Sequence, residues 1–241
     1  MKVTKKQLAE LITQAKAGSL EAQIKIADTY CYGWGVSEDK QKAIFWYKKA
    51  IEQGSVEALV NSEFCFTETL AYEAVEYYRQ LAEKGNTEAQ LILASLYDEG
   101  KCVPKNDAKA FQLRLQAAEL NNGQACYLVG SALVTGDGVE KNIEEGIKWL
   151  LKIANPKTTT SDFDMGGAQL SLSEAYADLE CPKRDLVEAY KWLNLLMADC
   201  PNEDFRLELV EKRDALASSM THEQIEEAQR RSAELFVPRK S

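Results

Sequence analysis

Residues 17–54 read AGSLEAQIKIADTYCYGWGVSEDKQKAIFWYKKAIEQG, and they describe one helical hairpin. Alanines and larger apolar residues recur at helical spacing on both sides of a glycine-rich turn, Gly33-Trp34-Gly35-Val36. Glycine accepts the positive φ that ends a helix, and the valine after the turn brings the chain back to the core. The stretch therefore predicts two amphipathic helices joined by this turn and closed by Gly54.

The same pattern recurs along the chain in a fixed register. In four copies, the reference alanine of the first helix and a small residue of the second helix stand the same distance apart. A weaker copy has Ala58 and Ala74, five residues closer, which predicts a tight hairpin loop. Self-similarity at a period of about 20–50 residues is typical of a solenoid. The four matching pairs are Ala22 and Ala43, Ala89 and Ala110, Ala125 and Gly146, and Ala168 and Ala189.

The residue types at these positions suit stacked hairpins. Alanine or glycine lets the two helices of a hairpin approach closely, and Trp or Tyr one turn later fills the space between hairpins. One hairpin cannot bury its apolar face alone, so consecutive hairpins must stack. We therefore predict an all-α fold, a right-handed α-solenoid of about five hairpins with N- and C-terminal capping helices. The aromatic residues expected in the core are Trp46, Tyr47, Trp149 and Trp192.

The order Ala, Leu-Gly, Tyr, Gly-x-Gly-Val, Asp, Lys-Ala, Trp-Tyr, Ala, Gly resembles the Sel1-like repeat, a relative of the tetratricopeptide repeat. The first copy matches nearly throughout, including Asp39, Lys42-Ala43 and Trp46-Tyr47. The fifth copy departs from the pattern, because its turn reads Leu179-Glu180-Cys181-Pro182. The resemblance covers roughly residues 17–198. It implies an α-solenoid that binds other macromolecules, usually as an adaptor, and it implies no particular partner.

We expect one solenoid domain over residues 1–241. The stretch 155–165, NPKTTTSDFDM, contains a seven-residue insertion and predicts a surface loop, either functional or simply tolerated. Thr221 and Gln224 form a capping-box pattern that opens the last helix. The expected segments are an N-terminal helix in 1–16, repeats at 17–53, 54–84, 85–121, 122–165 and 166–198, and capping helices in 199–241.

The charge balance narrows the class of partner. The chain has 29 Lys and Arg against 38 Asp and Glu, a formal charge of −9. Nucleic-acid binding depends on neutralising phosphates with basic residues, so this balance disfavours nucleic acid and anionic membranes as partners. It suits a basic protein. The N-terminal residues predict an amphipathic helix rather than a signal peptide, and no apolar run approaches the ~20 residues of a membrane span.

The sequence predicts no enzyme, no cofactor and no metal site. His222, the single histidine, falls in a helix cap, with no nucleophile or carboxylate linked to it in the sequence. The glycine turns follow helices rather than strands and lack a Gly-Lys-Ser/Thr, so they do not predict a phosphate loop. The six cysteines show no CxxC and no recurring pair, which favours reduced thiols in a cytoplasmic protein. They are Cys31, Cys65, Cys102, Cys126, Cys181 and Cys200.

The candidate binding surface is the first-helix face opposite the buried one, at positions +3, +6 and +10 from the reference alanine. It predicts a groove with acidic ends and an apolar centre around Phe64, Ile92 and Leu128. The alternative is a solvated helix face whose apolar members are covered by the next hairpin. The expected partner-binding residues are Lys25, Asp28, Tyr32, Asn61, Phe64, Glu68, Ser95, Glu99, Ser131, Thr135, Glu174 and Asp178.

Two functions from different classes follow from this surface. The first is an interaction scaffold or adaptor that binds a protein segment on the concave face. Such a segment would carry Lys or Arg beside an apolar anchor. The second is an immunity or inhibitor protein that blocks a toxin or enzyme by stoichiometric binding. The sequence does not fix the partner, the pathway or the oligomeric state.

Overall fold

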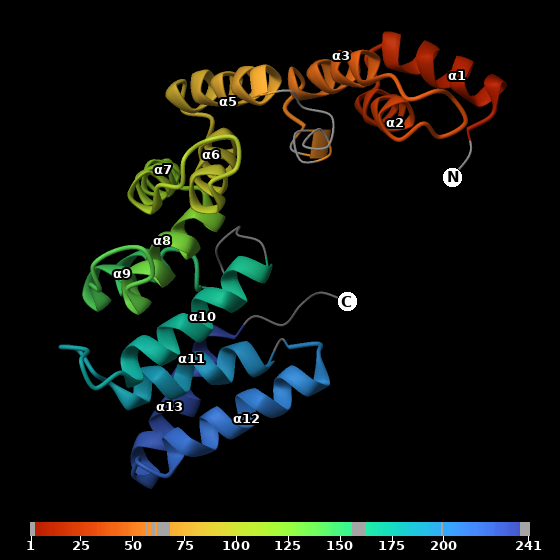
Figure 1. Cartoon of the computed structure of the whole chain (residues 1–241). Helices are drawn as coiled ribbons and strands as arrows, with labels where there is room; N and C mark the ends of the chain where they lie inside the picture. Colours follow the sequence, from red (N-terminus) through yellow and green to blue (C-terminus); the bar gives the residue numbers. More distant parts are fainter. Residues whose placement is uncertain are drawn as a thin grey trace. The chain divides into compact units, whose positions relative to one another are not determined.

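The computed structural model describes residues 3–55, 57–58, 61, 68–155, 162–198 and 200–236, and these residues form twelve α-helices with no strand. The predicted all-α fold of sequential helical hairpins is confirmed. The chain divides into two compact units, Met1–Lys105 (unit 1) and Asn106–Ser241 (unit 2). Figure 1 labels the helices of both units along the chain.

Unit 1 is a series of helices in which each contacts the next helix described. The helix α1 packs on α2, α2 on α3, and α5 on α6, with a smaller contact between α3 and α5 (Figure 1). The predicted N-terminal helix and both helices of the first hairpin are therefore confirmed. The loop of the shortened second hairpin lies outside the described residues. The helices are α1 (Lys5–Lys16), α2 (Leu20–Cys31), α3 (Lys40–Ile51), α5 (Glu68–Glu83) and α6 (Thr87–Glu99).

Unit 2 continues the same order of contacts. The helices α8 and α9 form one hairpin and α10 and α11 form the next, with α10 packed on both α8 and α9. The last two helices, α12 and α13, both pack on α11. The helices are α7 (Asp107–Glu119), α8 (Gly123–Thr135), α9 (Ile143–Leu151), α10 (Asp162–Ala177), α11 (Leu186–Ala198), α12 (Glu203–Ala217) and α13 (His222–Leu235).

The helix ends follow from local sequence. In the second helices, Asp39, Asn106 and Asn142 stand at the N-cap, where each side chain accepts an N–H of the first turn. Thr221 forms the predicted capping box with Gln224. The turn glycines have positive φ, as expected: +65° and +86° at Gly33 and Gly35, and +82° and +69° at Gly136 and Gly138.

The repeat register predicts the core correctly. The reference alanines of both helices are buried, from Ala22 at 2 % exposure to Ala43 at 0 %. The aromatic residues predicted to be core are buried too: Trp46, Tyr47, Trp149 and Trp192. Small residues at the crossing and large ones beside it thus fill the space within and between hairpins, as the sequence predicts.

A buried polar residue directly follows the reference alanine in three of the repeats. The Nε2 atoms of Gln23, Gln90 and Gln169 donate to the carbonyls of Ala15, Ala82 and Ala154 at 3.0–3.1 Å. At the same position Cys126 donates its thiol to the carbonyl of Ala118 at 3.6 Å. Each bond joins a first helix to the last turn of the helix before the junction or, at Ala154, to the residues just after α9. The carbonyls of Ala15, Ala82 and Ala118 also accept a backbone N–H three residues on, so the side chain is a second donor to each. We call these four bonds the carbonyl clasp.

The clasp shows the role of α1 and the effect of the insertion. Gln23 clasps α1 as Gln90 clasps α5, so α1 stands in the place of the second helix of a hairpin. Donor and acceptor are eight residues apart at three junctions and fifteen at the fourth, between Ala154 and Gln169. The seven inserted residues therefore leave the clasp intact.

The predicted surface loop at 155–165 is partly wrong. The helix α10 begins at Asp162, so the last four residues of that stretch are helical, while residues 156–161 lie outside those described. The inserted sequence thus lengthens a helix as well as its connection.

The cysteines differ from the expectation of reduced thiols at one position. Cys31, at the end of α2, is disulfide-bonded. Cys102, Cys126, Cys181 and Cys200 are not disulfide-bonded. Cys65 lies outside the described residues.

We expect alkylation of the denatured, unreduced protein to label fewer than the six cysteines labelled after reduction, because Cys31 is disulfide-bonded. Intact-mass spectrometry counts the labels, and freshly reduced protein is the control. Six labels without reduction would overturn the disulfide and restore the expectation of thiols alone.

The terminal helix α13 is held on α11 by an ion-pair network. Glu227 accepts from Arg230 at 2.7 Å and from Arg231 at 2.8 Å, and Arg231 also reaches Glu188 of α11 at 2.9 Å. Hydrogen bonds from Arg230 and then Arg231 lower the pKa of Glu227 to about 2, from an ordinary 4.5. The Glu227 carboxylate therefore orients the arginine that ties the cap to α11.

This network predicts an acid-dependent stability difference. Because the pKa of Glu227 is lowered on folding, its stabilisation is fully present above pH 4.5 and is lost as the pH falls towards about 2. We expect the wild type to unfold less easily than Glu227→Gln at neutral pH, with the difference shrinking across that window. Denaturant unfolding at several pH values measures it. Glu226→Gln, which leaves both arginines paired, is the control, and a pH-independent difference would contradict the prediction.

Candidate functional site

Three of the predicted binding residues lie on α2 or, in the case of Tyr32, at its C-cap in unit 1. Asp28 is half-buried, whereas Lys25 and Tyr32 are exposed. Tyr32 stacks on Trp34 with ring centroids 5.2 Å apart. The first-helix face of unit 1 therefore carries a charged middle and an aromatic end.

Asp28 connects this face to the core. The Tyr47 hydroxyl of α3 donates to Asp28 Oδ1, and Asn61 Nδ2 donates to the same oxygen at 3.5 Å. Burial raises the pKa of Tyr47, and its hydrogen bond to Asp28 raises it further, so the phenol stays protonated and keeps donating. Both donors are neutral, so they orient the carboxylate of Asp28 without neutralising it.

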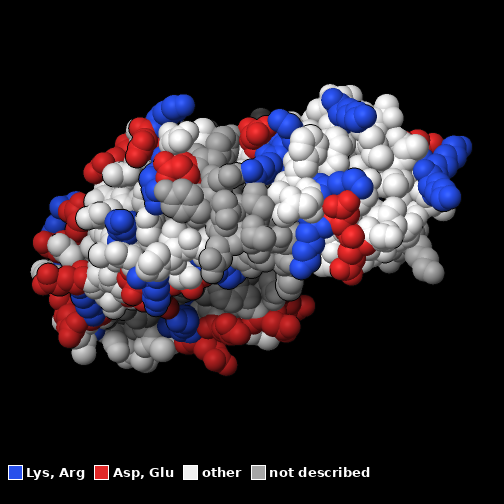
Figure 2. Space-filling view, turned by 45° about the horizontal axis from the view of Figure 1, so that its top comes forward, with Lys and Arg blue, Asp and Glu red and all other residues white. Residues whose placement is uncertain are grey.

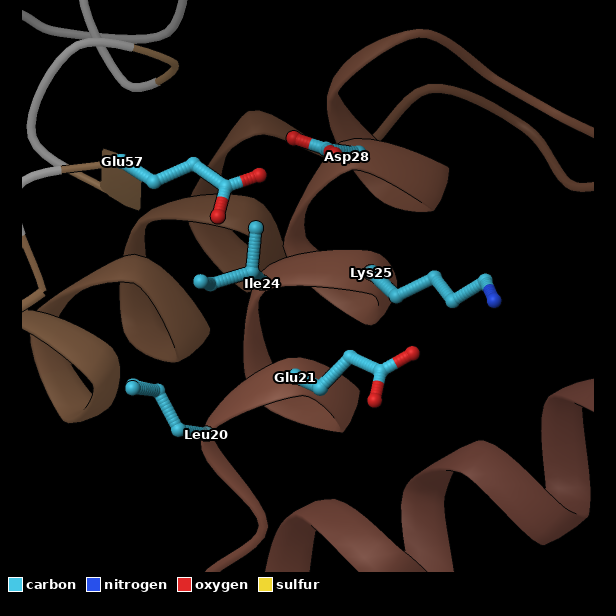
Figure 3. Close-up of a pocket in the computed structure, with 6 residues that line it drawn as sticks. All are labelled: Leu20, Glu21, Ile24, Lys25, Asp28 and Glu57. Atoms are coloured by element: carbon cyan, nitrogen blue, oxygen red, sulfur yellow. The ribbon is translucent and has the colours of Figure 1, made fainter. Parts of the chain in front are cut away.

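A cavity of about 360 Å³ opens beside Asp28. Five of the residues that line it come from α2, at spacings that place them on one face of a helix. The sixth is Glu57, whose side chain points toward α2 in the close-up view (Figure 3). The lining residues are Leu20, Glu21, Ile24, Lys25, Asp28 and Glu57.

Of the other predicted residues of unit 1, some lie within the described residues and some lie outside them. On α6, Ser95 bonds the carbonyl of Leu91 at 3.2 Å, and Glu99 pairs with Lys101 at 2.6 Å. Ile92, expected at the apolar centre, is half-buried. Phe64 lies outside the described residues, and so does the side chain of Glu68.

In unit 2 the chain's own lysines occupy the acidic positions of the predicted face. Glu174 of α10 pairs with Lys212 of α12 at 2.7 Å. Asp178 pairs with Lys141 at 3.0 Å, and Lys141 also contacts Glu180 at 2.7 Å. Basic and acidic side chains lie next to one another across much of the visible surface (Figure 2).

Hydrogen bonding fixes the charge of the Asp178 cluster. The backbone N–H of Glu180 and the ammonium of Lys141 lower the pKa of Asp178. The carboxylates of Glu180 and Asp178 in turn raise the pKa of Lys141. Asp178 and Lys141 are therefore both held in their charged forms at neutral pH, and Lys141 is shared between two carboxylates.

The small polar residues predicted in unit 2 bond locally. The Thr135 hydroxyl donates to the carbonyl of Ser131 at 3.0 Å, within α8. Leu128, expected at the apolar centre, is half-buried. These residues lie on the first helix of their repeat, as the register predicts.

The described residues show no group of three or more His, Cys, Asp or Glu side chains placed to hold a metal ion. His222 is 85 % exposed and lies 3.2 Å from Glu226, one turn along α13. Of the helices in the described ranges, none has the length and apolar character that crossing a bilayer requires.

Two features of the site are not predicted from the sequence. Glu21 and Glu57 belong to the cavity, yet they fall at positions −1 of the alanine register, which the +3, +6, +10 rule does not sample. Their common register position, one before Ala22 and one before Ala58, is a signal that could have found them. The lysines that pair in unit 2 had no such signal, because they are 37 and 38 residues from their partners.

Two relatives with a named regulatory role are similar to about half of this chain. Chitin synthase regulatory factor 2 of Schizosaccharomyces pombe is 32% identical over 138 residues, which cover 54% of this chain and 26% of that protein. The exopolysaccharide production negative regulator of Rhizobium meliloti is 30% identical, covering 51% and 48%. The chain thus spans about a quarter to a half of the length of these relatives.

Two further matches cover more of the chain. The Sel1-repeat-containing protein YjcO of Escherichia coli is 25% identical, covering 78% of this chain and 82% of that protein. The crystal structure of a Sel1 repeat protein from Oxalobacter formigenes is 24% identical, covering 80% and 79%, with a TM-score of 0.46.

The family model for the Sel1 repeat matches residues 20–55, 71–86, 87–122, 123–155 and 167–195, which is more than half of the chain. These matches follow the hairpins of both units, from α2 to α11. The chain belongs to the Sel1 repeat family.

Proposed function

We propose that the protein is a non-enzymatic adaptor that binds a segment of another protein along the first-helix face. The supporting observation is the cavity on α2, which has mixed apolar and charged walls of the kind that recognise side chains. Two of the relatives named above are called a regulatory factor and a negative regulator, which supports a role in binding. The formal charge of −9 favours a basic protein over nucleic acid or an anionic membrane.

Affinity capture with charge-reversed baits tests this proposal. The first bait is the wild type, and the second carries Asp28→Lys, Glu99→Lys and Asp178→Lys on the first-helix face. We expect a partner retained by the wild type to be lost by this variant, because reversed charges repel a basic segment.

A matched control variant distinguishes the effect of the first-helix face from the effect of the change in net charge. Glu52→Lys, Glu119→Lys and Glu144→Lys make the same change in charge on or beside the second helices, and this variant should keep the partner. Equal retention or equal loss by both variants would refute binding on the first-helix face. A single enzyme captured in stoichiometric amount, with its activity abolished, would instead identify the inhibitor function.

The redox state of Cys31 indicates the cellular compartment of the protein. A cytoplasmic location, expected from reduced thiols, is supported if alkylation labels all six cysteines without reduction. Persistence of the disulfide supports an oxidising compartment, because cytosolic reductants keep thiols reduced. The labelling count therefore decides between the two.

A further inference from the structure

The cavity on α2 has an apolar base and an acidic rim. Leu20 and Ile24 supply the apolar surface, one turn apart on the helix. Glu21, Asp28 and Glu57 supply carboxylates around it, and Figure 3 shows the Glu57 carboxylate near Ile24. A long side chain with an apolar stem and a cationic head matches this distribution.

The charges of the cavity are not balanced within the described residues. Neither Glu21 nor Glu57 forms an ion pair in the described ranges, and Asp28 is bonded only by neutral donors. Among the described residues that line the cavity, Lys25 is the single basic one, and its ammonium points away from Glu57 in the close-up (Figure 3). Three carboxylates against one ammonium leave two negative charges.

Unit 2 shows which side chain of the chain itself contacts the carboxylate at the equivalent register position. Glu174 stands at the same register position as Asp28, six residues after the reference alanine. Its carboxylate contacts the ammonium of Lys212, 2.7 Å away, on a helix from outside the repeats. The chain therefore already places a lysine on a first-helix carboxylate of this kind.

The volume of the cavity limits the size of the occupant. At about 360 Å³ it lies near the lower end of the ~300–1,000 Å³ range of ligand pockets. That size suits one long side chain better than a whole helix.

We propose that this cavity binds a lysine or arginine side chain of a partner protein. The methylene stem lies on Leu20 and Ile24, and the cationic group bonds the carboxylates of Glu21 and Glu57, with Asp28 adding to the negative potential. The inference rests on the proposed adaptor function and names the chemistry of the residue that the adaptor recognises. The formal charge of −9 of the whole chain favours approach of the same class of partner.

The test uses a fluorescein-labelled peptide in which leucine and lysine alternate. Its matched probe is the same peptide with every lysine acetylated, which keeps the stem and removes the charge. Fluorescence anisotropy of the full chain should show binding of the lysine peptide that weakens as salt is added. Binding of the acetylated peptide should be at least about tenfold weaker.

The variant Glu21→Gln, Glu57→Gln should lose about tenfold in affinity for the lysine peptide, because both charge-assisted bonds become neutral. The control Glu10→Gln, Glu88→Gln makes the same charge change and includes the first-turn carboxylate of α6, the register equivalent of Glu21. It should bind as the wild type does. Thermal melting confirms that both variants are folded.

Three results would overturn the inference. They are equal binding of the acetylated peptide, equal affinity in the Glu21→Gln, Glu57→Gln variant and the control, and no binding by the wild type at about 1 mM peptide. None of these three results excludes the proposed adaptor function. If captured partners are still lost by the Asp28, Glu99 and Asp178 reversal, the face binds a protein by another chemistry.

Discussion

Replacing Gly146 by valine lowers the free energy of unfolding of unit 2 by about 3 kcal/mol, the upper part of the usual range for overpacking. Gly146 lies where α9 crosses α8. A Cβ at this position would stand 2.8 Å from the carbonyl oxygen of Gly130 and 2.7 Å from Cγ2 of Val134. Because one of these atoms belongs to the backbone, rotation of a side chain cannot relieve the contact.

Hydrogen exchange and denaturant unfolding measure the effect. Faster exchange should appear in α8 and α9 first, since a repeat array loses stability near the substituted hairpin. Gly166→Ala is the control, because its Cβ would meet only the end of the Leu196 side chain, at 3.3 Å. An unchanged midpoint for Gly146→Val would contradict the close crossing of α8 and α9.

Replacing Tyr47 by alanine costs unit 1 about 4 kcal/mol, because a fully buried ring is removed and a cavity is left. Tyr47→Phe costs about 1.5 kcal/mol, since it removes only the hydrogen bond to the Asp28 carboxylate. The difference between the two variants measures the contribution of the ring.

The phenylalanine variant also tests the link between the core and the binding face. With the phenol absent, Asp28 keeps Asn61 as a partner, and its carboxylate is less firmly oriented. Denaturant unfolding of both variants gives the free energies, and exchange in α2 and α3 gives the location. Equal losses in the two variants would show that the hydrogen bond, rather than the ring, stabilises the hairpin.

Most of the fold could be predicted from the register of the repeats. Alanines and glycines at the crossing positions fixed where the helices meet, and the aromatic residues beside them were correctly placed in the core. Thr221 and Gln224 fixed the start of α13, because a capping box is a local pattern. Features that depend on neighbours in the sequence were therefore predictable.

Features that depend on distant neighbours were not. Glu174 and Asp178 read as exposed acids of a groove, yet Lys212 and Lys141 bond them across 38 and 37 residues. Nor does sequence spacing show that Glu57 faces α2 across a cavity. The helical start of α10 was missed because Pro156 and a run of threonines predicted a loop through residue 165.

The carbonyl clasp has a consequence for how such a chain can change length. At the four junctions where the clasp is found, a side chain of the incoming helix holds the preceding backbone, so the connecting segment carries little of the geometry. The junction between Ala154 and Gln169 demonstrates this, since it keeps the 3.0 Å bond with seven more residues between donor and acceptor. Junctions of this kind are places where a lineage can acquire, lengthen or delete a connecting segment while the register of the neighbouring repeats is inherited unchanged.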